Sequence, residues 1–343
     1  MIKILIADDS IFVREQLRQL FLGQSDCVVV GEAGQGKECV ELTARLHPNI
    51  IIMDVDMPVM DGIEATRVIM ENTPTPIVIH TSSYISRSRN VPFEAIKMGA
   101  IDIIEKPNMY PLSAMEEKEF INRLRMIAGI KVFRRRKSKA EIQTPVAREP
   151  IQSHSLPSIL AIAASTGGPK AIFDIFGLLP PFLPFPVVLV QHIGASFVAG
   201  FIEWLQNTTH VQMKIAEHGE PLLPNVCYVS PGGKHLSTNV THQVVLDDSP
   251  PVHSCKPSAD ILFTSVSKAY KSNAVGVLLT GIGEDGARGL CDMRQAGAVT
   301  IAQDEESSVV FGMPKKAIEL HAASMIGNIP QISEHIRNLF HLQ

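Results

Sequence analysis

Carboxylates follow two of the apolar segments in the first third of the chain. Asp8 and Asp9 come directly after Lys3–Ala7, and Asp54 comes directly after Asn49–Met53. If these segments are neighbouring parallel strands, the three carboxylates meet at one edge of the sheet. Carboxylates crowded in this way raise each other's pKa unless a hard cation neutralises them, and Mg²⁺ prefers such oxygen ligands. The pattern therefore predicts a magnesium pocket that could accept a phosphoryl group.

Polar residues also follow the next two apolar segments of this region. Thr81 and Ser82 offer hydroxyl donors to a phosphoryl oxygen, and Lys106 in Lys106-Pro107 offers a cation able to pair with an aspartyl phosphate. Acids at strand ends are also common helix caps, so each residue alone says little. Their joint placement at four strand ends favours phosphoryl chemistry.

A serine in the second half lies at the turn that follows another apolar segment. In the run Ser165-Thr166-Gly167-Gly168-Pro169 the proline suits the first turn of a helix, so Ser165 would lie beside N–H groups that can stabilise an oxyanion. The spacing is not the GxSxG of an α/β-hydrolase. An ordinary glycine-rich turn is an equally simple interpretation. A phosphate-binding loop is another, although GxGxxG spacing and a P-loop lysine are missing.

A histidine and two acids could complete a nucleophilic site around this serine. His192 follows the strand candidate 187–191, and Glu284 and Asp285 lie in a glycine-rich turn after a later candidate. A serine nucleophile needs a base, and the base needs an orienting acid. A strand-end histidine among twelve is more often a polar cap, and the glycine-rich turn would also suit a phosphate loop. Ser165, His192 and one of the acids are thus candidates for acyl transfer.

The elements that would position the carboxylates are five short apolar segments without polar alternation, as expected for parallel strands covered on both faces. They alternate with helical patterns, which is typical of a doubly wound α/β sheet, here with the expected order 2-1-3-4-5. The strand candidates are Lys3–Ala7, Cys27–Gly31, Asn49–Met53, Pro76–His80 and Ala100–Ile104. The helix candidates are 11–22, 35–46, 62–71, 91–98 and 111–129.

A change in composition separates this region from a second α/β pattern. Basic residues gather over 131–139, which we interpret as a solvated helix end rather than an anionic docking strip, and prolines and serines follow. Residues 132–155 cannot bury enough apolar surface to fold alone and are predicted to be a linker. The expected division is therefore one domain over 1–125, a helix end and linker over 126–155, and a second domain over 156–343.

The second domain is predicted to be another doubly wound α/β fold, and no internal repeat is found in the chain. Its strand candidates are 159–164, 187–191, 213–216, 226–230, 243–246, 275–280 and 299–302. Its helix candidates are 169–178, 196–206, 258–271, 286–296 and 314–321.

Composition limits the classes of function. The 343 residues suit two domains, and 45% hydrophobic with 19% charged residues excludes a wholly disordered chain. A formal charge of −4 removes the electrostatic case for a dedicated nucleic-acid binder. No apolar run approaches the ~18 to 20 residues needed to cross a bilayer, and acids appear too early for a signal-peptide core. Five scattered cysteines without CxxC spacing imply neither a disulfide framework nor a zinc site, so we expect a reducing cytoplasm.

The first region resembles the response-regulator receiver family over about residues 1–125. The matching residues are Asp8-Asp9, the run 54–62, Thr81 and Lys106-Pro107. The resemblance implies a flavodoxin-like fold in which Asp54 accepts phosphate from a histidine kinase, with Thr81 and Lys106 as switch residues. The implied Mg²⁺ ligands are Asp8, Asp9, Asp54 and the backbone carbonyl of Asp56. Ile103 departs from the pattern, because many receivers carry an aromatic residue there.

The second region resembles the catalytic domain of the CheB family, the protein-glutamate methylesterases of bacterial chemotaxis, over about residues 157–325. The matching segments are 165–169, 191–192, 228–232, 257–260, 279–286 and 311–314. The resemblance implies that Ser165 is the nucleophile, His192 the general base and Asp285 the orienting acid, since the family motif ends in Asp-Gly. Thr166 and Ile282 would support the oxyanion. Ile193-Gly194 and Ile282 depart from the family's usual Met-Pro and Met.

Together the resemblances imply phosphorylation-regulated hydrolysis of glutamyl γ-methyl esters, and deamidation of glutamines, on the cytoplasmic helices of chemoreceptors. The expected partners are a chemotaxis histidine kinase and methyl-accepting chemoreceptors, without nucleic acid or membrane insertion. The receiver would need Mg²⁺, whereas the esterase step would need no cofactor. The alternative is a response regulator whose second half binds a nucleotide or protein without catalysis.

Overall fold

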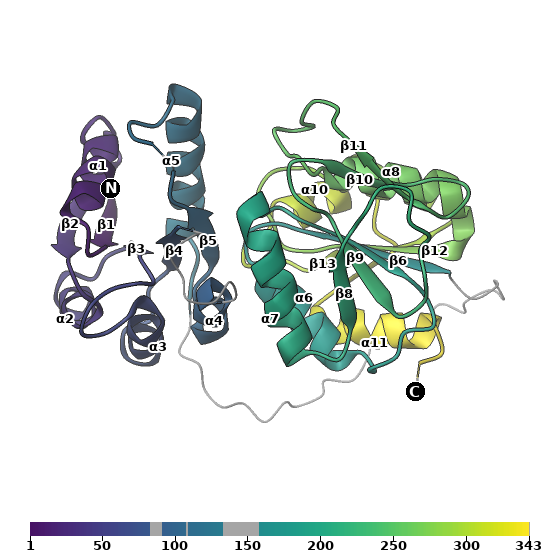
Figure 1. The fold of residues 1–343 in the computed structure, drawn as a ribbon, viewed down its shortest axis with the longest axis horizontal. Coiled ribbons are helices and arrows are strands. Elements are labelled where there is room, and N and C mark those ends of the chain that lie inside the picture. Colours follow the sequence, from purple (N-terminus) through teal and green to yellow (C-terminus); the bar gives the residue numbers. More distant parts are fainter. Residues whose placement is uncertain (83–90, 108, 133–157, 343) are drawn as a thin grey trace.

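The computed structural model describes residues 1–82, 91–107, 109–132 and 158–342, which form two α/β lobes side by side (Figure 1). The first lobe runs from β1 (Ile2–Ala7) to α5 (Ala114–Ala128), and the second from β6 (Ile159–Ala164) to α11 (Ile329–Leu339). The predicted fold class is confirmed. Within the described ranges, no helix combines the length and the apolar character needed to cross a membrane.

The first lobe is built on a five-stranded sheet of order β2-β1-β3-β4-β5, in which every neighbouring pair is parallel, as predicted. Its remaining strands are β2 (Cys27–Ala33), β3 (Ile50–Met53), β4 (Ile77–Thr81) and β5 (Asp102–Glu105). Its other helices are α1 (Ile11–Leu22), α2 (Gly36–Leu46), α3 (Gly62–Asn72) and α4 (Val91–Met98). Only α5 starts clearly later than expected, because Ser113 forms a capping box with Glu116 at its N-terminus.

Helices cover both faces of this sheet. Leu5 and Ala7 of β1 pack in the same core cluster as residues of α2, α3 and α4, whereas Ile4 and Ile6 pack with residues of α1 and α5. Side chains alternate between the faces of a strand, so β1 must be apolar on both sides. This explains its uninterrupted apolar sequence.

The second lobe is built on a seven-stranded sheet of order β14-β13-β12-β6-β7-β9-β8, with parallel neighbours throughout. The chain passes from β6 to β7 on one side and later returns to β12 on the other side of β6. Ligand sites of such sheets lie outside the carboxyl ends of the strands where the order reverses. The remaining strands of this sheet are β7 (Val187–Gln191), β8 (Gln212–Ile215), β9 (Val226–Val229), β12 (Ala274–Leu278), β13 (Val299–Gln303) and β14 (Met325–Gly327).

Helices again form a layer on each face. One face carries α6 (Gly168–Leu178), α7 (Val198–Thr208) and α11, whose apolar residues share one core cluster. The other face carries α8 (Ala259–Tyr270), α9 (Ala287–Gln295) and α10 (Met313–Glu319), which share a second cluster. Two short 3₁₀ turns, Ala195–Phe197 and Lys271–Asn273, precede α7 and β12.

Three elements of the second lobe are not among the predicted ones: β10 (His235–Thr238), β14 and α11. β10 pairs antiparallel with β11 (Val244–Asp247), so a separate hairpin accompanies the parallel sheet. β10 has only one apolar residue among its four, and β14 has three residues and ends in glycine, so neither forms the apolar run that marks the other strands. In contrast, the sequence of α11 does carry local signals of a helix. Asn328 and Gln331 form a capping box at its N-terminus, and isoleucines recur at regular spacing along it. The predicted linker lies almost entirely outside the described residues, from 133 onward.

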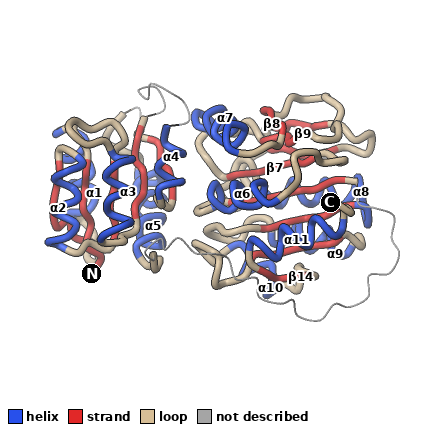
Figure 2. Tube along the Cα trace, turned by 90° about the horizontal axis from the view of Figure 1, so that it is seen from below, coloured by secondary structure: helices blue, strands red, loops and turns tan. Residues whose placement is uncertain are grey.

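An aromatic contact joins the two lobes. Phe93 of α4 lies with its ring centroid 5.7 Å from that of Trp204 and 5.5 Å from that of Phe201, both in α7. Figure 2 shows α4 on the side of the first lobe that faces α7. One buried apolar cluster therefore runs without interruption from the first sheet to the second.

Candidate active site

Ser165 lies at the turn between β6 and α6, and its backbone is held in place from two sides. Its N–H donates to Thr280 O (3.0 Å), and its carbonyl accepts from Gln191 Nε2 (2.9 Å). A methyl group on Gly281 would lie 2.7 Å from Ser165 Cβ, so this position needs glycine for the close approach. The buried serine is thus fixed at the carboxyl edge of the sheet.

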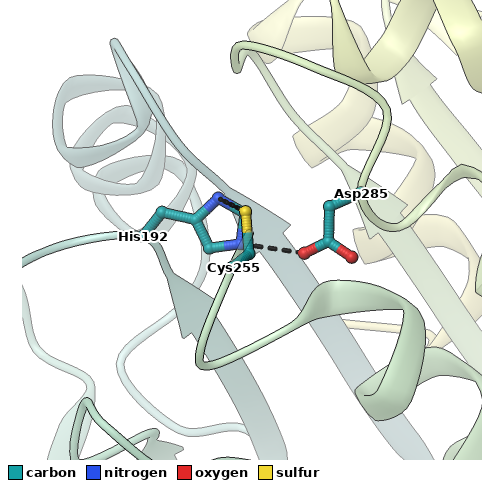
Figure 3. A group of neighbouring side chains, drawn as sticks. All are labelled: His192, Cys255 and Asp285. Atoms are coloured by element: carbon teal, nitrogen blue, oxygen red, sulfur yellow. Dashed lines mark hydrogen bonds and ion pairs between the residues drawn. The ribbon is translucent and has the colours of Figure 1, made fainter. Parts of the chain in front are cut away.

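His192 and Asp285 meet at the same edge. The His192 N–H donates to Ala164 O (3.0 Å) at the end of β6, and its ring Nε2 lies 2.9 Å from Asp285 Oδ2 (Figure 3). Asp285 comes from the glycine-rich turn that follows β12. Parallel strands on either side of β6 therefore bring the two side chains together across 93 positions of sequence.

The Asp285 carboxylate is also bound by the N-terminus of α8. Ser258 Oγ donates to its Oδ1 (2.7 Å), and the N–H groups of Ala259 and Asp260 donate to Oδ2 and Oδ1 (2.7 and 3.1 Å). Backbone N–H groups at a helix N-terminus favour a negative charge. The carboxylate is consequently both oriented and kept ionised.

These contacts move the pKa values of the pair in opposite directions. Burial alone would raise the pKa of Asp285, but its hydrogen bonds from His192, Ser258 and Ala259 lower it. Burial alone would lower the pKa of His192, but its hydrogen bonds to Asp285 and Cys255 raise it to about 9. The imidazolium form of His192 is therefore favoured at neutral pH.

Glu284 and Asp285, adjacent in sequence, have different surroundings. The Glu284 carboxylate lies 3.3 Å from His253 Nδ1 and 3.9 Å from Lys316 Nζ, and half of it is exposed. The buried Asp285 carboxylate contacts the His192 ring. Of the two acids, Asp285 is the one placed to orient this histidine.

The second ring nitrogen of His192 is also engaged. Its Nδ1 lies 3.7 Å from Cys255 Sγ, and the Cys255 side chain lies close to both His192 and Asp285 (Figure 3). In the part of the chain that the structure describes, the Ser165 hydroxyl forms no hydrogen bond with His192. The structure brings the three predicted residues to one site but leaves the serine outside the hydrogen-bonded pair.

Ser165 and His192 open into a cavity of about 580 Å³, which Thr166 and Ile282 also line. Within the described part of the chain, the backbone N–H groups of Thr166 and Ile282 donate to no acceptor. Free donors in a serine site are what an oxyanion requires. The cavity can therefore admit a carbonyl group beside the serine.

A second cluster of charged side chains lies in the first lobe. Ligand oxygens of Asp8, Asp9 and Asp54 all lie within 4.8 Å of one another. Lys106 Nζ lies 2.7 Å from both Asp8 Oδ2 and Asp54 Oδ2. Burial and the charge of Asp54 raise the pKa of Asp8 to about 6, although Lys106 opposes the shift. The predicted carboxylates and the predicted cation are thus neighbours.

Two family models match the chain: the response regulator receiver domain over residues 4–114 and the CheB methylesterase over residues 160–336. A protein-glutamate methylesterase/protein-glutamine glutaminase of Syntrophus aciditrophicus is 39% identical over 95% of each chain. Another from Methanospirillum hungatei is 38% identical over 99% of this chain and 98% of its own. The chain belongs to the CheB methylesterase family.

A solved structure supports the same assignment for the second lobe. The CheB methylesterase catalytic domain of Thermotoga maritima is 34% identical, with a TM-score of 0.52, and covers 53% of this chain and 98% of its own. The predicted family and enzyme class are confirmed. In CheB terms, the first lobe is the receiver domain and the second is the methylesterase domain.

The receiver pocket of this CheB protein suits Mg²⁺. Its three carboxylates supply only oxygen ligands, and the pKa of Asp8 is raised first by burial and then by the charge of Asp54, which a bound cation would offset. The Thr81 side chain is buried at the end of β4, and the Lys106 N–H donates to Thr81 O (3.0 Å). Burial and the charge of Asp54 also raise the pKa of Asp56, which places its side chain near the pocket.

The receiver domain of this CheB protein forms one wall of the methylesterase cavity. Met115, Asn122 and Met126 of α5 line that cavity together with Ser165. In addition, Thr166 Oγ1 donates to Asp102 Oδ2 of β5 (2.9 Å), and Asp102 is held by Arg123 at 2.8 Å. The face made by β5 and α5 thus covers the candidate serine.

The sequence analysis assigned no role to three residues of this arrangement. Ser258 lies in the segment 257–260, which carried family resemblance but no chemistry, although a serine before a helix is a readable N-cap signal. Cys255 and Asp102 have no local signal, because their partners His192 and Thr166 lie 63 and 64 positions away.

Proposed function

We propose that this CheB protein hydrolyses glutamyl γ-methyl esters, and deamidates glutamines, on the cytoplasmic helices of methyl-accepting chemoreceptors. The proposal rests mainly on the oriented His192–Asp285 pair beside Ser165 in one cavity. In this proposal Ser165 is the nucleophile, His192 the general base and Asp285 the orienting acid. The names of the relatives supply the substrate class.

The reaction would proceed as two acyl transfers. Ser165 Oγ bonds to the γ-carbonyl carbon while its proton passes to His192, and the free N–H groups of Thr166 and Ile282 bind the developing oxyanion. His192 then protonates the leaving group, which departs as methanol from an ester or as ammonia from an amide. Water attacks the acyl-enzyme with His192 again as base, and glutamate and free Ser165 result.

The His192 side chain, as drawn in Figure 3, is not yet oriented for this reaction. Both ring nitrogens of His192 have partners, Asp285 and Cys255, whereas catalysis requires one nitrogen to face Ser165. We expect His192 to change its side-chain rotamer when substrate enters the cavity. The hydrogen bonds that hold Asp285 to α8 would keep that carboxylate in place during the change.

Phosphorylation of Asp54 by a chemotaxis histidine kinase would regulate access to the cavity. Asp8, Asp9 and Asp54, with the backbone carbonyl of Asp56, would hold Mg²⁺, which neutralises charge on the incoming phosphoryl group. Thr81 and Lys106 would then bind its oxygens. A phosphorylated state that packs less well against the methylesterase domain shifts the population toward open molecules. Because a chemotaxis histidine kinase and the cytoplasmic helices of chemoreceptors are the expected partners, we expect the protein to act in the cytoplasm.

The test is methanol release from methylated receptor membranes, with and without a small phosphodonor and Mg²⁺. We expect release from the full chain that rises with phosphodonor. Release at the same rate with and without phosphodonor would support the esterase activity and contradict its regulation by phosphorylation. No release from a folded chain under either condition would contradict the proposal.

Two variants assign the release to the cavity. Ser165→Ala should abolish methanol release while receptor binding persists, and retained release would contradict the role of Ser165. Ser237→Ala, in the hairpin strand β10 and outside the cavity lining, is the matched control and should keep normal release. Nucleotide titration of the same preparations would detect the alternative, a nucleotide-binding output domain, which no specific contact in the cavity favours.

A further inference from the structure

Cys255 contacts His192 but has no role in the proposed reaction. Its Sγ lies 3.7 Å from Nδ1 of the ring, while Nε2 of the same ring lies 2.9 Å from Asp285 Oδ2 (Figure 3). The three side chains can each offer one ligand atom within 4.8 Å of the others. A thiol, an imidazole and a carboxylate are all metal-binding groups, so the arrangement calls for a comparison with metal sites.

The separation of sulfur and nitrogen fits a bound zinc ion. With Zn–S of about 2.3 Å and Zn–N of about 2.1 Å, two ligands at a tetrahedral angle lie about 3.6 Å apart. The observed separation of Cys255 Sγ and His192 Nδ1 is 3.7 Å. An ion could bind between these two atoms with almost no movement of either side chain.

The surroundings of His192 also resemble those of a metal-binding histidine. A histidine that binds metal through one nitrogen usually donates the N–H of the other to a carboxylate, which fixes the ring and raises its basicity. Asp285 occupies that position, and Ser258 and the N–H groups at the start of α8 fix it in turn. Asp285 would therefore support the histidine and need not bind the ion itself.

The segment that carries Cys255 presents the thiol to the cavity. Val252 and Cys255 hydrogen-bond each other's backbone in both directions (3.1 and 2.8 Å), which closes a tight turn. Cys255 is partly exposed and lines the 580 Å³ cavity together with Ser165. Water or another small ligand can thus complete the coordination from the cavity side.

We propose that Cys255 and His192 form a binding site for a thiophilic divalent cation, with Zn²⁺ as the expected ion. Coordination releases two protons to solvent, one from the Cys255 thiol and one from Nδ1 of the His192 imidazolium, and the ion then occupies Nδ1. The bound ion would hold His192 in its present rotamer and block the cavity beside Ser165, so the cation is an inhibitor of the esterase. Inhibition rests on the proposed function, whereas cation binding does not.

The other thiols of the described residues make poor competitors. Cys27, Cys39 and Cys227 are buried, and burial raises the pKa of each thiol. Cys291 on α9 is partly exposed like Cys255, but its partner is the Gln295 side chain. Cys291→Ser is therefore the matched control. The receiver carboxylates also attract divalent cations, but only through oxygen.

Binding is tested on the full chain with Co²⁺, whose thiolate complexes absorb in the near ultraviolet and whose oxygen complexes do not. We expect one equivalent of thiolate-bound Co²⁺ in the unmodified chain and in Cys291→Ser, with the band displaced by one equivalent of Zn²⁺. Cys255→Ala should lose the band while its circular dichroism stays that of a folded chain. A band that persists in Cys255→Ala, or none in the unmodified chain, would overturn the site.

Inhibition is tested by methanol release with Zn²⁺ and excess Mg²⁺ against the same mixture with chelator. The ratio of the two rates should fall at least tenfold in the unmodified chain and in Cys291→Ser, and stay near one in Cys255→Ala. Equal inhibition of the unmodified chain and Cys255→Ala would overturn the inhibitory role. If no preparation releases methanol, the proposed function fails, and the cobalt band still decides the cation site.

Discussion

The hydroxyl of Thr166 donates a 2.9 Å hydrogen bond to the carboxylate of Asp102, and this bond joins the two domains next to the candidate nucleophile. Both groups are buried, and Arg123 of α5 binds the same oxygen, Asp102 Oδ2, at 2.8 Å. The contact thus ties the position of the receiver directly to the chemistry of the methylesterase cavity.

The first prediction follows from this contact. Asp102→Asn should raise methanol release without phosphodonor by roughly ten- to hundredfold, because a hydrogen bond to a charged group contributes about 1.5–3 kcal/mol and 1.4 kcal/mol corresponds to a factor of ten. The control is Asp26→Asn, which removes a carboxylate paired with Arg125 of the same helix but remote from Thr166. An equal rise in both variants would mean that general loosening of the receiver is responsible.

A second prediction uses the single tryptophan of the chain. Trp204 is fully buried and stacks on Phe93 of the receiver at 5.7 Å and on Phe173 of its own domain at 5.1 Å. If phosphorylation separates the domains, phosphodonor with Mg²⁺ should shift its fluorescence emission to the red. Phe93→Ala should show much of this shift before phosphodonor is added, since the aromatic contact is already gone.

The matched variant for this fluorescence experiment is Ser165→Ala, which should respond to phosphodonor like the unmodified chain because domain separation precedes chemistry. Methanol release that rises with no change in emission would argue against separation at the α4–α7 contact.

The third prediction concerns pH. His192 must be neutral to act as a base, and its pKa is raised to about 9, so the rate should climb about tenfold per pH unit toward pH 9 and then level off. Asp285→Asn removes the charge and hydrogen bond that raise this pKa, so burial should then bring the inflection to lower pH. The maximal rate should also fall, by as much as roughly 10⁴ if the wrong tautomer is selected as in serine proteases.

Glu284→Gln provides the comparison for the pH profile, because its carboxylate contacts His253 and Lys316 rather than His192. Its inflection should stay near that of the unmodified chain. A pH profile of methanol release that is the same in Asp285→Asn and the unmodified chain would rule out Asp285 as the partner that sets the His192 pKa.

A fourth prediction concerns the receiver pocket. Lys106 lies 2.7 Å from both Asp8 and Asp54, so Lys106→Ala should lower the free energy of unfolding in chelator by as much as about 3 kcal/mol by leaving two buried carboxylates without their cation. Mg²⁺ should restore more stability to this variant than to the unmodified chain, since it replaces the lost charge. Thermal unfolding with chelator and with Mg²⁺ measures both effects.

The control for the pocket is Arg67→Ala on α3. Arg67 pairs with Glu64 and Glu71 at an exposed surface, where such pairs contribute about 0–1 kcal/mol. It should change stability little and should not alter the response to Mg²⁺. A Lys106→Ala protein that Mg²⁺ stabilises no more than the unmodified chain would contradict a cation site formed by these carboxylates.

Much of the fold could be read from the sequence because its signals are local. Uninterrupted apolar runs such as 50–53 and 159–164 belong to parallel strands buried on both faces, and polar residues after them must lie at one edge of a sheet. Asp54 and Ser165 were found in this way. The strands β10 and β14 were missed because neither contains a long apolar run: β10 has a single apolar residue among four, and β14 has three residues and ends in glycine.

Local sequence patterns are sufficient to place these residue types at strand ends, and therefore to indicate the two kinds of chemistry available to the chain. Which of these residues meet depends on the folded arrangement. It turned Asp285 toward His192 and Glu284 away, brought Cys255 to the other ring nitrogen, and placed Asp102 against Thr166. These contacts depend on loop conformations and on the packing of one domain against another. No local pattern encodes such packing, because the partners lie 31 to 93 positions apart in the sequence and show no periodic relation to each other.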